Sequence, residues 1–431
     1  MSENKTTLPR LRFPEFRKAG AWEEKRLGDV YSFKVTNSFS RDKLNYDHGE
    51  VKNIHYGDIH TKFSALFDIE KENVPFINPD QPIQRISEEN YCVEGDLVFA
   101  DASEDLDDVG KCIELVNLNG ERVLSGLHTI LARQIHSEII VGFGAYLFAS
   151  PAIRRIVKRE SQGAKVLGIS GGRLAGIDIF FPKDKAEQQK IADCLSSLDD
   201  LITARGRKVA ALERHKKGLM QQLFPATGQT TPQLRFPEFR EAGAWEEKRL
   251  GDIGKVSMCK RIMKHETKET GDIPFYKIGT FGKKADAYIS NEIFDLYRQK
   301  YSFPKIGDIL ISASGTIGRT VVFDGQPAYF QDSNIVWIAN DEKLVSNSFL
   351  AFIYQKVKWV TDDNTIARLY NDNLRSIEIT IPSPPEQQKI AECLTSLDDL
   401  IRAEAQKLDA LKAHKKGLMQ QLFPNPDGGA P

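Results

Sequence analysis

Apolar residues recur at alternating spacings of four and three in two stretches of the chain, residues 186–225 and 385–424. This heptad pattern, sustained over roughly five repeats, predicts two long helices that each carry a coiled-coil seam. Each helix would be about 58 Å long, with Pro225 and Pro424 at their ends. The seam positions are Ile191, Leu195, Leu198, Ile202, Leu212, Ile390, Leu394, Leu397, Ile401 and Leu411.

The starts of both helices are also marked in the sequence. Ser383 and Glu386 have the spacing of a capping box around Pro384, and Asp184 and Glu187 hold the same places in the first copy. A long apolar seam is unstable in water, so each helix needs a partner. The simplest partner is the other helix, and the order of segments along the chain favours antiparallel pairing.

Charged residues interrupt the seam near its midpoint. Arg205 lies at this point in one helix and Glu404 in the other. We expect these opposite charges to lie in neighbouring layers of the coiled coil. The alternative is that both are solvated and that the two helices bind different partners.

The long helices belong to an internal duplication. Residues 187–225 recur at 386–424 with 29 of 39 positions identical, and residues 11–29 recur at 234–252 with 18 of 19 identical. The stretches between the copies, residues 30–186 and 253–385, differ in length and nearly everywhere in sequence. Two identical scaffolds with unlike inserts predict a pseudo-twofold chain that docks two identical partners and performs two different recognition tasks.

Both inserts mix β-branched runs, turns and short helical stretches, which predicts an α/β (mixed α+β) domain for each. They share a faint skeleton, which indicates one fold with different surface loops. The matching positions are Tyr56–Ile59 with Tyr276–Gly279, Gly95–Val98 with Gly307–Leu310, Val109–Lys111 with Ile317–Arg319, and Leu174, Ile177 and Ile179 with Leu374, Ile377 and Ile379. The predicted divisions are a first domain at 1–185, a long helix at 186–225, a second domain at 226–384 that includes the repeat segment 234–252, a long helix at 385–424 and a tail at 425–431.

The composition is that of a water-soluble globular protein, with 41% hydrophobic and 28% charged residues. The sequence has no apolar run long enough to span a bilayer and no signal peptide at its N-terminus, so we expect a cytoplasmic protein. Five scattered cysteines without a CxxC pair argue against a disulfide framework and against a structural zinc site. The net charge of −1 is a poor match to a simple nucleic-acid binder.

Motifs for catalysis are missing from the sequence. It has no GxxxxGK[ST] phosphate loop, no Asn/Asp-Pro-Pro-aromatic motif of an amino-methyltransferase, and no pair of histidines spaced to hold a metal on one helix face. The glycine cluster GISGGRLAG also lacks the GxGxxG pattern of a dinucleotide site. We therefore expect a chain without a catalytic site and without a bound metal or cofactor of its own.

Local patches favour DNA contact in places. Residues 255–300 hold ten Lys/Arg against six Asp/Glu, interleaved with aromatic residues, whereas residues 66–108 hold thirteen Asp/Glu against two Lys/Arg and must mostly face away from phosphates. Cations hold phosphates, and polar or aromatic side chains on loops reach base edges. For each patch the alternative is an ordinary solvated surface or turn. The candidate DNA-contacting residues are Tyr56, His60, Lys62, Ser103, Lys111, His128, Lys165, Arg173, Lys260, Arg261, Tyr276, Lys277, Ser312, Ser314, Arg319, Asn334, Arg368 and Tyr370.

The order of variable domain, long helix, variable domain and long helix resembles the specificity subunits of type I restriction–modification systems along nearly the whole chain. VEGDLVFADASEDLDDVGK and VLSGLHTILAR look like one group of target-recognition domains, and GDILISASGTIGR and YFQDSNIVWI look like another. The helix start PPEQQKIAECLTSLDDLI is similar to the repeated helices of that family.

The resemblance implies two target-recognition domains that each read one half of an asymmetric, bipartite site in double-stranded DNA, with the coiled coil as a ruler for the spacer. Two modification subunits would dock near the repeats, bind S-adenosylmethionine and methylate adenine, and restriction subunits that use ATP and magnesium would join them. The base contacts themselves do not follow from the resemblance, because recognition loops differ between members.

Two functions of a different class stay open at this point. One is a self-sufficient transcriptional regulator, which would bind its site tightly without a partner. The other is a purely structural coiled-coil adaptor, which would lose nothing when its base-facing loops are exchanged. A specificity subunit for a system that only methylates is a further possibility within the same family.

Overall fold

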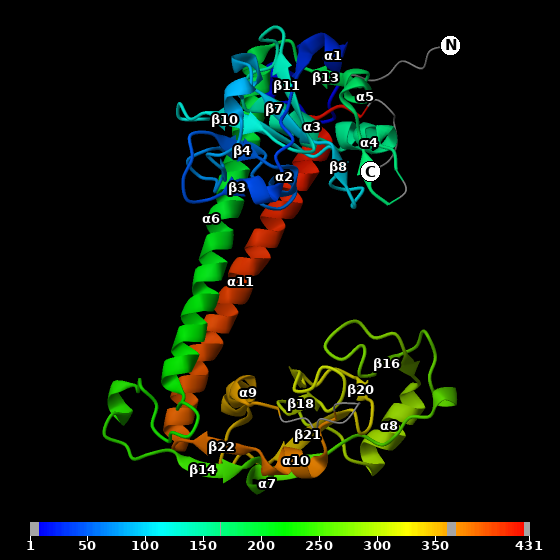
Figure 1. Cartoon of the computed structure of the whole chain (residues 1–431). Coiled ribbons are helices and arrows are strands. Elements are labelled where there is room, and N and C mark those ends of the chain that lie inside the picture. The colour runs from blue at the N-terminus through cyan, green and yellow to red at the C-terminus, as the bar shows by residue number, and fades with distance from the viewer. Residues whose placement is uncertain (1–7, 164, 360–367, 426–431) are drawn as a thin grey trace. The chain divides into compact units, whose positions relative to one another are not determined.

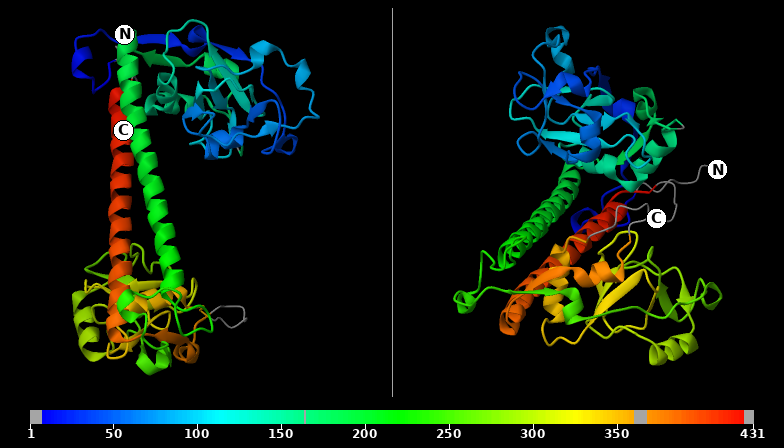
Figure 2. Two further views of the ribbon diagram at one scale, coloured as in Figure 1. Left: turned by 90° about the vertical axis from the view of Figure 1, so that its left-hand side faces the viewer. Right: turned by 60° about the horizontal axis from the view of Figure 1, so that its bottom comes forward.

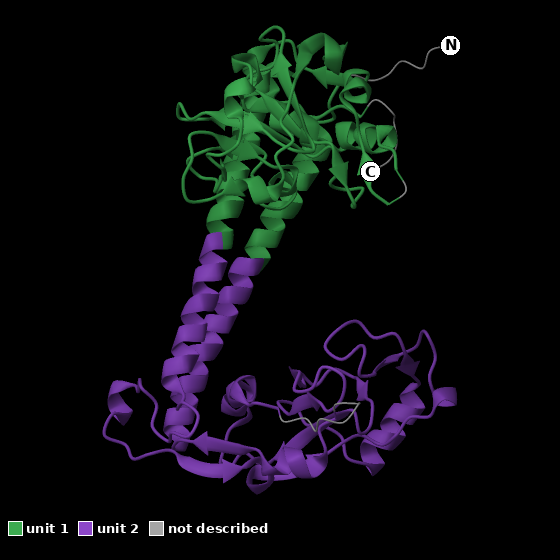
Figure 3. Cartoon of the chain, viewed as in Figure 1, with its two compact units in different colours: residues 1–206, 406–431 green, residues 207–405 purple. Residues whose placement is uncertain are grey.

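The computed structural model describes residues 8–163, 165–359 and 368–425, and it divides into two compact units. Unit 1 comprises residues 1–206 and 406–431, and unit 2 comprises residues 207–405 (Figures 1 and 3). Each unit thus contains one variable region together with one end of each long helix. Among the described residues, no helix has the length and apolar character needed to cross a membrane.

Unit 1 is built around a five-stranded sheet in the order β2-β11-β7-β9-β5, in which the β5–β9 pair is parallel and the other pairs are antiparallel. These strands span Tyr31–Lys34 (β2), Thr129–Gln134 (β11), Leu97–Ala100 (β7), Cys112–Asn117 (β9) and Leu66–Asp68 (β5). A smaller sheet, β10-β4-β6-β3, joins Val123–Ser125, Lys52–Ile54, Phe76–Ile77 and Leu44–Asn45. Two ribbons pair β1 (Glu23–Arg26) with β13 (Asp178–Phe181), and β8 (Ala102–Ser103) with β12 (Leu167–Gly168).

The central strand β7 explains how the core of unit 1 is divided. All four of its residues are buried, and their side chains alternate between two faces as strand geometry requires. Leu97 and Phe99 enter one apolar cluster, whereas Val98 and Ala100 enter the other. The short helices of this unit are α1 (Leu27–Val30), α2 (Tyr56–Thr61), α3 (Phe143–Ala149), α4 (Pro151–Glu160) and α5 (Gly171–Ala175).

Unit 2 repeats this plan with fewer strands. Its main sheet is antiparallel, β15-β21-β18-β19, spanning Gly254–Ser257, Ile335–Asn340, Ile309–Ser312 and Thr320–Val322. The smaller sheet β17-β16-β20 spans Tyr288–Ile289, Ile273–Tyr276 and Tyr329–Phe330, and a ribbon pairs β14 (Glu246–Arg249) with β22 (Glu378–Ile381). The short helices are α7 (Leu250–Ile253), α8 (Asn291–Lys300), α9 (Asn347–Lys356) and α10 (Asn371–Ser376).

The shared skeleton predicted for the two inserts is confirmed at most positions. Gly95 and Gly307 both have positive φ, near 87° and 89°. The N–H of Gly95 donates to the carbonyl of Leu115 in β9, and that of Gly307 donates to the carbonyl of Phe323, just after β19. One equivalence is wrong: Tyr276 is the last residue of β16 and aligns with Ile54 at the end of β4, because both strands pair in parallel with β20 or β10. Tyr56 therefore lies two residues beyond the position that Tyr276 occupies.

The two predicted long helices are present as α6 (Lys185–Leu223) and α11 (Pro384–Leu422). In unit 1 the beginning of α6 lies beside the end of α11, where Lys415 pairs with Asp199. In unit 2 the end of α6 lies beside the beginning of α11, where the Nζ of Lys216 is 2.6 Å from Asp398. The helices are therefore antiparallel in each unit, as predicted (Figures 1 and 2).

Burial along the predicted seam is uneven. Ile191, Leu195, Ile390 and Leu394 are buried, because the globular part of each unit covers the end of the helix pair. The remaining predicted seam residues are half-buried, since two paired helices leave the flanks of their seam open to water. These are Leu198, Ile202, Leu212, Leu397, Ile401 and Leu411.

Near the midpoint of the helix, Glu404 is 3% exposed and accepts a hydrogen bond from the Nζ of Lys208 at 3.2 Å. Lys208 is a partner that the seam pattern did not indicate, because it lies outside the apolar positions. The pairing of Glu404 with Arg205 stays a prediction.

The repeated N-terminal segment fastens the start of each long helix. Arg12 makes a bidentate pair with Glu187, with N–O distances of 2.7 and 2.6 Å, and Arg235 makes the same pair with Glu386. Both carboxylates are 1% exposed. The capping-box interpretation of Glu386 is therefore wrong, because its carboxylate binds a guanidinium 151 residues away and not the backbone at Ser383.

An aromatic trio completes the same junction in both units. In unit 1 the ring of Phe423, just beyond α11, lies 6.0 Å from Trp22 and 5.8 Å from Phe143. In unit 2 Phe224, just beyond α6, lies 5.8 Å from Trp245 and 5.3 Å from Phe349. Each unit thus closes its core with the end of one long helix.

One carboxyl group is buried in the sheet of unit 1. Glu114 of β9 is 0% exposed and its Oε2 accepts the N–H of Ala145, at 2.7 Å, from the first turn of α3. Burial raises the pKa of Glu114 from 4.5 to about 7, although the backbone N–H groups act against this shift. Because the folded state holds this proton more tightly than the unfolded chain, Glu114 makes stability fall as the pH rises between these two values.

We expect Arg12→Ala to destabilise unit 1 by about 3–5 kcal/mol, because it leaves the carboxylate of Glu187 buried without its partner. Arg235→Ala should do the same to unit 2. Lys190→Ala is the control, since it removes an exposed ion pair with Glu15 and an exposed contact with the ring of Phe13, and it should cost about 1 kcal/mol. Denaturant unfolding followed by circular dichroism measures these changes, and equal small losses for all three variants would contradict a structural role for the buried pairs.

Glu114→Gln should remove part of the pH dependence of stability. The ionised carboxylate costs about 3 kcal/mol above its folded pKa, so the variant should gain melting temperature over the wild type as the pH rises from 5 to 8. Thermal unfolding across this pH range provides the measurement. The exposed Glu104→Gln should follow the wild-type profile, and a Glu114→Gln profile parallel to the wild type would show that Glu114 does not titrate as its burial implies.

Candidate nucleic-acid interface

Three segments of unit 1 meet at one end of the five-stranded sheet: residues 101–103 after β7, the turn at 126–128 before β11, and residues 168–170 before α5. Backbone hydrogen bonds hold them together. The N–H of Asp101 donates to the carbonyl of His128 at 3.0 Å, and the N–H of Ile169 donates to the carbonyl of Asp101 at 2.8 Å. We call these three segments the first platform.

Unit 2 holds an equivalent set, residues 313–315 after β18, 332–334 before β21 and 368–370 before α10, which we call the second platform. The N–H of Ala313 donates to the carbonyl of Asn334 at 2.7 Å, and the N–H of Leu369 donates to the carbonyl of Ala313 at 2.8 Å. The backbones of the two platforms are thus bonded in the same way, while their side chains differ at nearly every position.

The first platform carries a cluster of ring side chains. Tyr56, at the start of α2, lies 5.3 Å from the ring of His128 and 5.8 Å from that of His60. The Nε2 of His60 is 3.0 Å from the carbonyl of Ala102, and the Nζ of Lys111 donates to the carbonyl of His60 at 2.6 Å. The structure thus brings together five of the predicted residues, Tyr56, His60, Ser103, Lys111 and His128.

The other three predicted DNA-contacting residues of unit 1 lie outside this cluster of rings. Lys62 contacts the carboxylate of Asp58 at 2.9 Å and the hydroxyl of Tyr46 at 3.0 Å. Arg173 donates to the carbonyl of Glu160, so it turns toward α4, and Lys165 is exposed in the loop before β12. Their DNA contacts stay predictions.

Sequence reasoning missed a polar group behind Tyr56. Asp58 is 1% exposed and binds Arg41 at 2.7 Å as well as Lys62. Burial lowers the pKa of His55 to about 4, with a further contribution from Arg41, so this ring is neutral at pH 7. The signal available in the sequence was weak, because only Lys62 has a local spacing from Asp58, whereas Arg41 comes from a segment 17 residues earlier.

In the second platform, ion pairs and hydrogen bonds converge on the turn at 332–334. The Nε of Arg261 donates to Asp332 at 2.9 Å, the hydroxyl of Ser314 donates to Asn334 at 2.9 Å, and Arg368 donates to the carbonyl of Ser333 at 3.2 Å. A hollow of about 360 Å³ adjoins this turn, and its lining includes Arg368 and the exposed Tyr370. The structure thus places Arg261, Ser314, Asn334, Arg368 and Tyr370 around one turn.

The remaining candidates of unit 2 lie elsewhere. Tyr276 stacks on Phe330, Lys277 pairs with Asp286 at 2.8 Å, and Lys260 lies over the ring of Tyr301. Arg319 donates to the carbonyl of Phe281.

Ser312 requires a correction. Its side chain is 2% exposed, and its hydroxyl accepts the N–H of Arg319 at 2.8 Å and donates to the carbonyl of Thr316. Its one donor and one of its two acceptor lone pairs are thus used to close the turn between β18 and β19. Ser312 supports the fold, and its burial argues against the predicted DNA contact.

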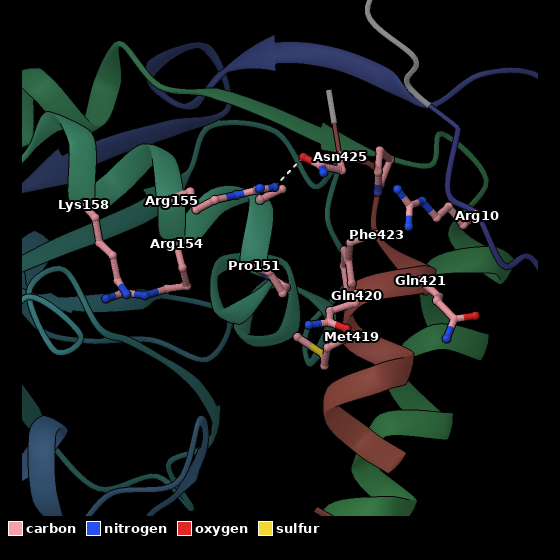
Figure 4. Close-up of a pocket in the computed structure, with 12 residues that line it drawn as sticks. Arg10, Pro151, Arg154, Arg155, Lys158, Met419, Gln420, Gln421, Phe423 and Asn425 are labelled. Atoms are coloured by element: carbon pink, nitrogen blue, oxygen red, sulfur yellow. Dashed lines mark hydrogen bonds between the residues drawn. The ribbon is translucent and has the colours of Figure 1, made fainter. Parts of the chain in front are cut away.

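A basic hollow of about 480 Å³ lies in unit 1 between α4 and the end of α11 (Figure 4). Arg10, Arg154, Arg155 and Lys158 contribute cations to its lining. Arg154 donates to the carbonyls of Gly110, Asp107 and Val109, and Lys158 pairs with Asp107. Arg155 donates to the side-chain oxygen of Asn425, so these residues chiefly tie α4 to the adjacent loop and to the segment after α11.

Within the described part of the chain, no three or more His, Cys, Asp or Glu residues gather in a way that could hold a metal ion. The type I restriction modification DNA specificity domain matches residues 20–214 and 243–413, which is most of the chain and both variable regions. The chain belongs to this family. Its function therefore lies in the recognition of DNA sequence within a restriction–modification system.

Known relatives agree with this assignment. A proposed type I restriction enzyme specificity subunit of Haemophilus influenzae is 63% identical over 152 residues, covering 35% of this chain and 40% of that protein. The chain thus spans less than half the length of this relative. A proposed MjaX specificity subunit of Methanocaldococcus jannaschii is 25% identical over 423 residues, covering 93% of this chain and 92% of that protein.

Solved structures share the fold. The specificity subunit of a type I restriction–modification system from M. genitalium has a TM-score of 0.60 at 14% identity, over 96% of this chain and 99% of that one. A chain from a study of complex assembly in the type I restriction–modification system has a TM-score of 0.53 at 17% identity, over 94% and 98%. The predicted arrangement of two mixed α/β domains and two paired long helices is confirmed as the fold of this family.

Proposed function

We propose that this chain is the DNA-reading subunit of a type I restriction–modification complex and that it reads a bipartite, asymmetric target. The supporting observation is the contrast between the repeated junctions and the two platforms. Arg12 with Glu187 and Arg235 with Glu386 make identical contacts, whereas the side chains of the two platforms differ. Identical junctions suit two copies of one partner, and different platforms suit two different half-sites.

The partners in this proposal are two modification subunits and one or more restriction subunits. The modification subunits would bind S-adenosylmethionine and methylate adenine, and the restriction subunits would use ATP and magnesium to cleave DNA. The chain itself would be non-catalytic, would bind none of these cofactors and would act in the cytoplasm. Its near-zero net charge is consistent with a chain that recognises bases while its partners supply much of the positive charge that binds the DNA phosphates.

The alternatives differ in what they require. A stand-alone regulator would bind its DNA site tightly without any partner, and a structural adaptor would be indifferent to changes at the platforms. The proposed subunit would need its modification partner for sequence-specific binding. Gel-shift titrations with and without the modification subunit distinguish the regulator from the other two.

Exchange of residues 30–186 for the corresponding region of another specificity subunit should change one half of the methylated target and leave the other half intact. The reason is that the platform of unit 1 and most of its core come from this region, while unit 2 has its own. Sequencing of methylated DNA after co-expression with the modification subunit gives the readout. A change in both halves would contradict independent reading, and unchanged halves would favour the adaptor.

A chain of residues 1–225 should form a dimer and direct methylation to a palindromic target. The core of unit 1 includes Met419, Leu422 and Phe423, which this shortened chain lacks. A second copy can supply the repeat equivalents Met220, Leu223 and Phe224 from the end of its own α6. Analytical ultracentrifugation tests the dimer, and a stable monomer would contradict the equivalence of the two helix ends.

A further inference from the structure

The platforms offer exposed nitrogen groups whose direction is fixed by a carboxylate. In the first platform the Nδ1 of His128 lies 3.2 Å from Asp101, and the His128 side chain is 51% exposed. In the second platform the Nε of Arg261 donates to Asp332 at 2.9 Å, and the Arg261 side chain is 66% exposed. Both carboxylates are more buried than the basic groups that they orient, at 30% and 16%.

The two pairs arise from different segments but have the same chemistry. Asp101 follows β7 and His128 precedes β11, whereas Asp332 precedes β21 and Arg261 comes from the loop after β15. The turns that carry His128 and Ser333 place these residues in the left-handed region, with φ of 54° and 60°. Such a backbone is uncommon for residues other than glycine, and it is frequent at functional sites.

The pairing decides what kind of DNA contact Arg261 can make. A guanidinium that is already paired with a carboxylate adds little net charge, so it is a poor source of affinity for phosphate. Its Nε–H is used by Asp332, which leaves the two terminal nitrogens as a fork in a fixed plane. A fork of this kind matches the O6 and N7 acceptors of guanine in the major groove.

We propose that His128 and Arg261, each oriented by a carboxylate at its platform, are specificity-determining residues of the two domains, and that Arg261 reads a guanine. This inference rests on the proposed function, because it assigns the readers within a DNA-recognising subunit. Asp101 and Asp332 are positioning residues that set the direction of the reading groups. The equivalent backbone bonds of the platforms hold Asp101, His128 and the turn that carries Asp332, while Arg261 reaches Asp332 from the loop after β15.

The test uses the full chain co-expressed with its modification subunit, followed by sequencing of the methylated DNA. Arg261→Gln should lower the preference for guanine at one position of one half-site by about 5- to 150-fold. Arg261→Lys should lose less of the preference than Arg261→Gln, because lysine can still donate to O6 and N7 but lacks the planar fork. His128→Ala should alter only the other half-site.

Lys343→Gln provides a matched control. Lys343 is 81% exposed and pairs with Asp341 at 2.9 Å, but it lies beyond the opposite end of β21 from Asp332. This variant should leave both half-sites unchanged. Thermal unfolding should show that Arg261→Gln folds like the wild type, because an exposed ion pair contributes at most about 1 kcal/mol.

A uniform loss of DNA binding and methylation in Arg261→Gln that Arg261→Lys restores, with the methylated sequence unchanged, would overturn the proposal, because it would assign Arg261 to a phosphate. The same conclusion would follow if Arg261→Gln left the methylated sequence unchanged and only reduced the salt dependence of DNA binding. If the wild-type chain itself directed no sequence-specific methylation, the proposed function would fail, and the assignment of readers would fail with it. If the wild type methylated a defined target and Arg261→Gln methylated the same target with the same preference, only the assignment of Arg261 would be overturned.

Discussion

Each unit of this chain depends on the end of a long helix to close its core. Phe423 packs between Trp22 and Phe143 in unit 1, and Phe224 packs against Trp245 and Phe349 in unit 2. The residues that complete unit 1 come from the far end of the sequence, so its globular region and the helix pair form together. Because the two helices are antiparallel in each unit, each one starts at one variable region and ends in the core of the other.

The junctions that close each core are distinct from the platforms that we propose contact DNA. The junctions use side chains that are repeated in the sequence, such as the buried pair of Arg12 and Glu187, and a change there destabilises the unit. The platforms are held chiefly by backbone hydrogen bonds, for which the side chains are free to differ. Asp101 and His128 in one platform thus correspond to Ala313 and Asn334 in the other without a change in the backbone bonding. A new specificity can arise at the platforms at little cost to the fold.

The local sequence pattern was sufficient to predict the helices and the central strands. The side-chain contacts of the candidate DNA interface could not be predicted in this way, because many of them join residues far apart in the sequence. The heptads gave the long helices to within a few residues, and the glycine turns at Gly95 and Gly307 gave the entry to the central strands. The capping-box interpretation of Glu386 failed because its partner is 151 residues away. Burial of Ser312 was missed for a different reason, since its partner Arg319 is only seven residues away but the turn that joins them is not marked by the hydrophobic pattern. The carboxylate that orients Arg261 lies 71 residues along the chain, and no local spacing indicates it.

The net charge of −1 becomes consistent with sequence recognition once affinity and specificity are considered separately. Affinity for DNA comes mainly from cations on phosphates and can be supplied by a partner subunit. Specificity requires donors and acceptors with fixed directions. A carboxylate beside a guanidinium or an imidazole fixes those directions, and beside the guanidinium it also cancels much of the charge. Acidic residues such as Asp101 and Asp332 are therefore expected next to the groups that contact bases. A rigid group with little net charge can discriminate between bases without adding affinity for DNA of every sequence.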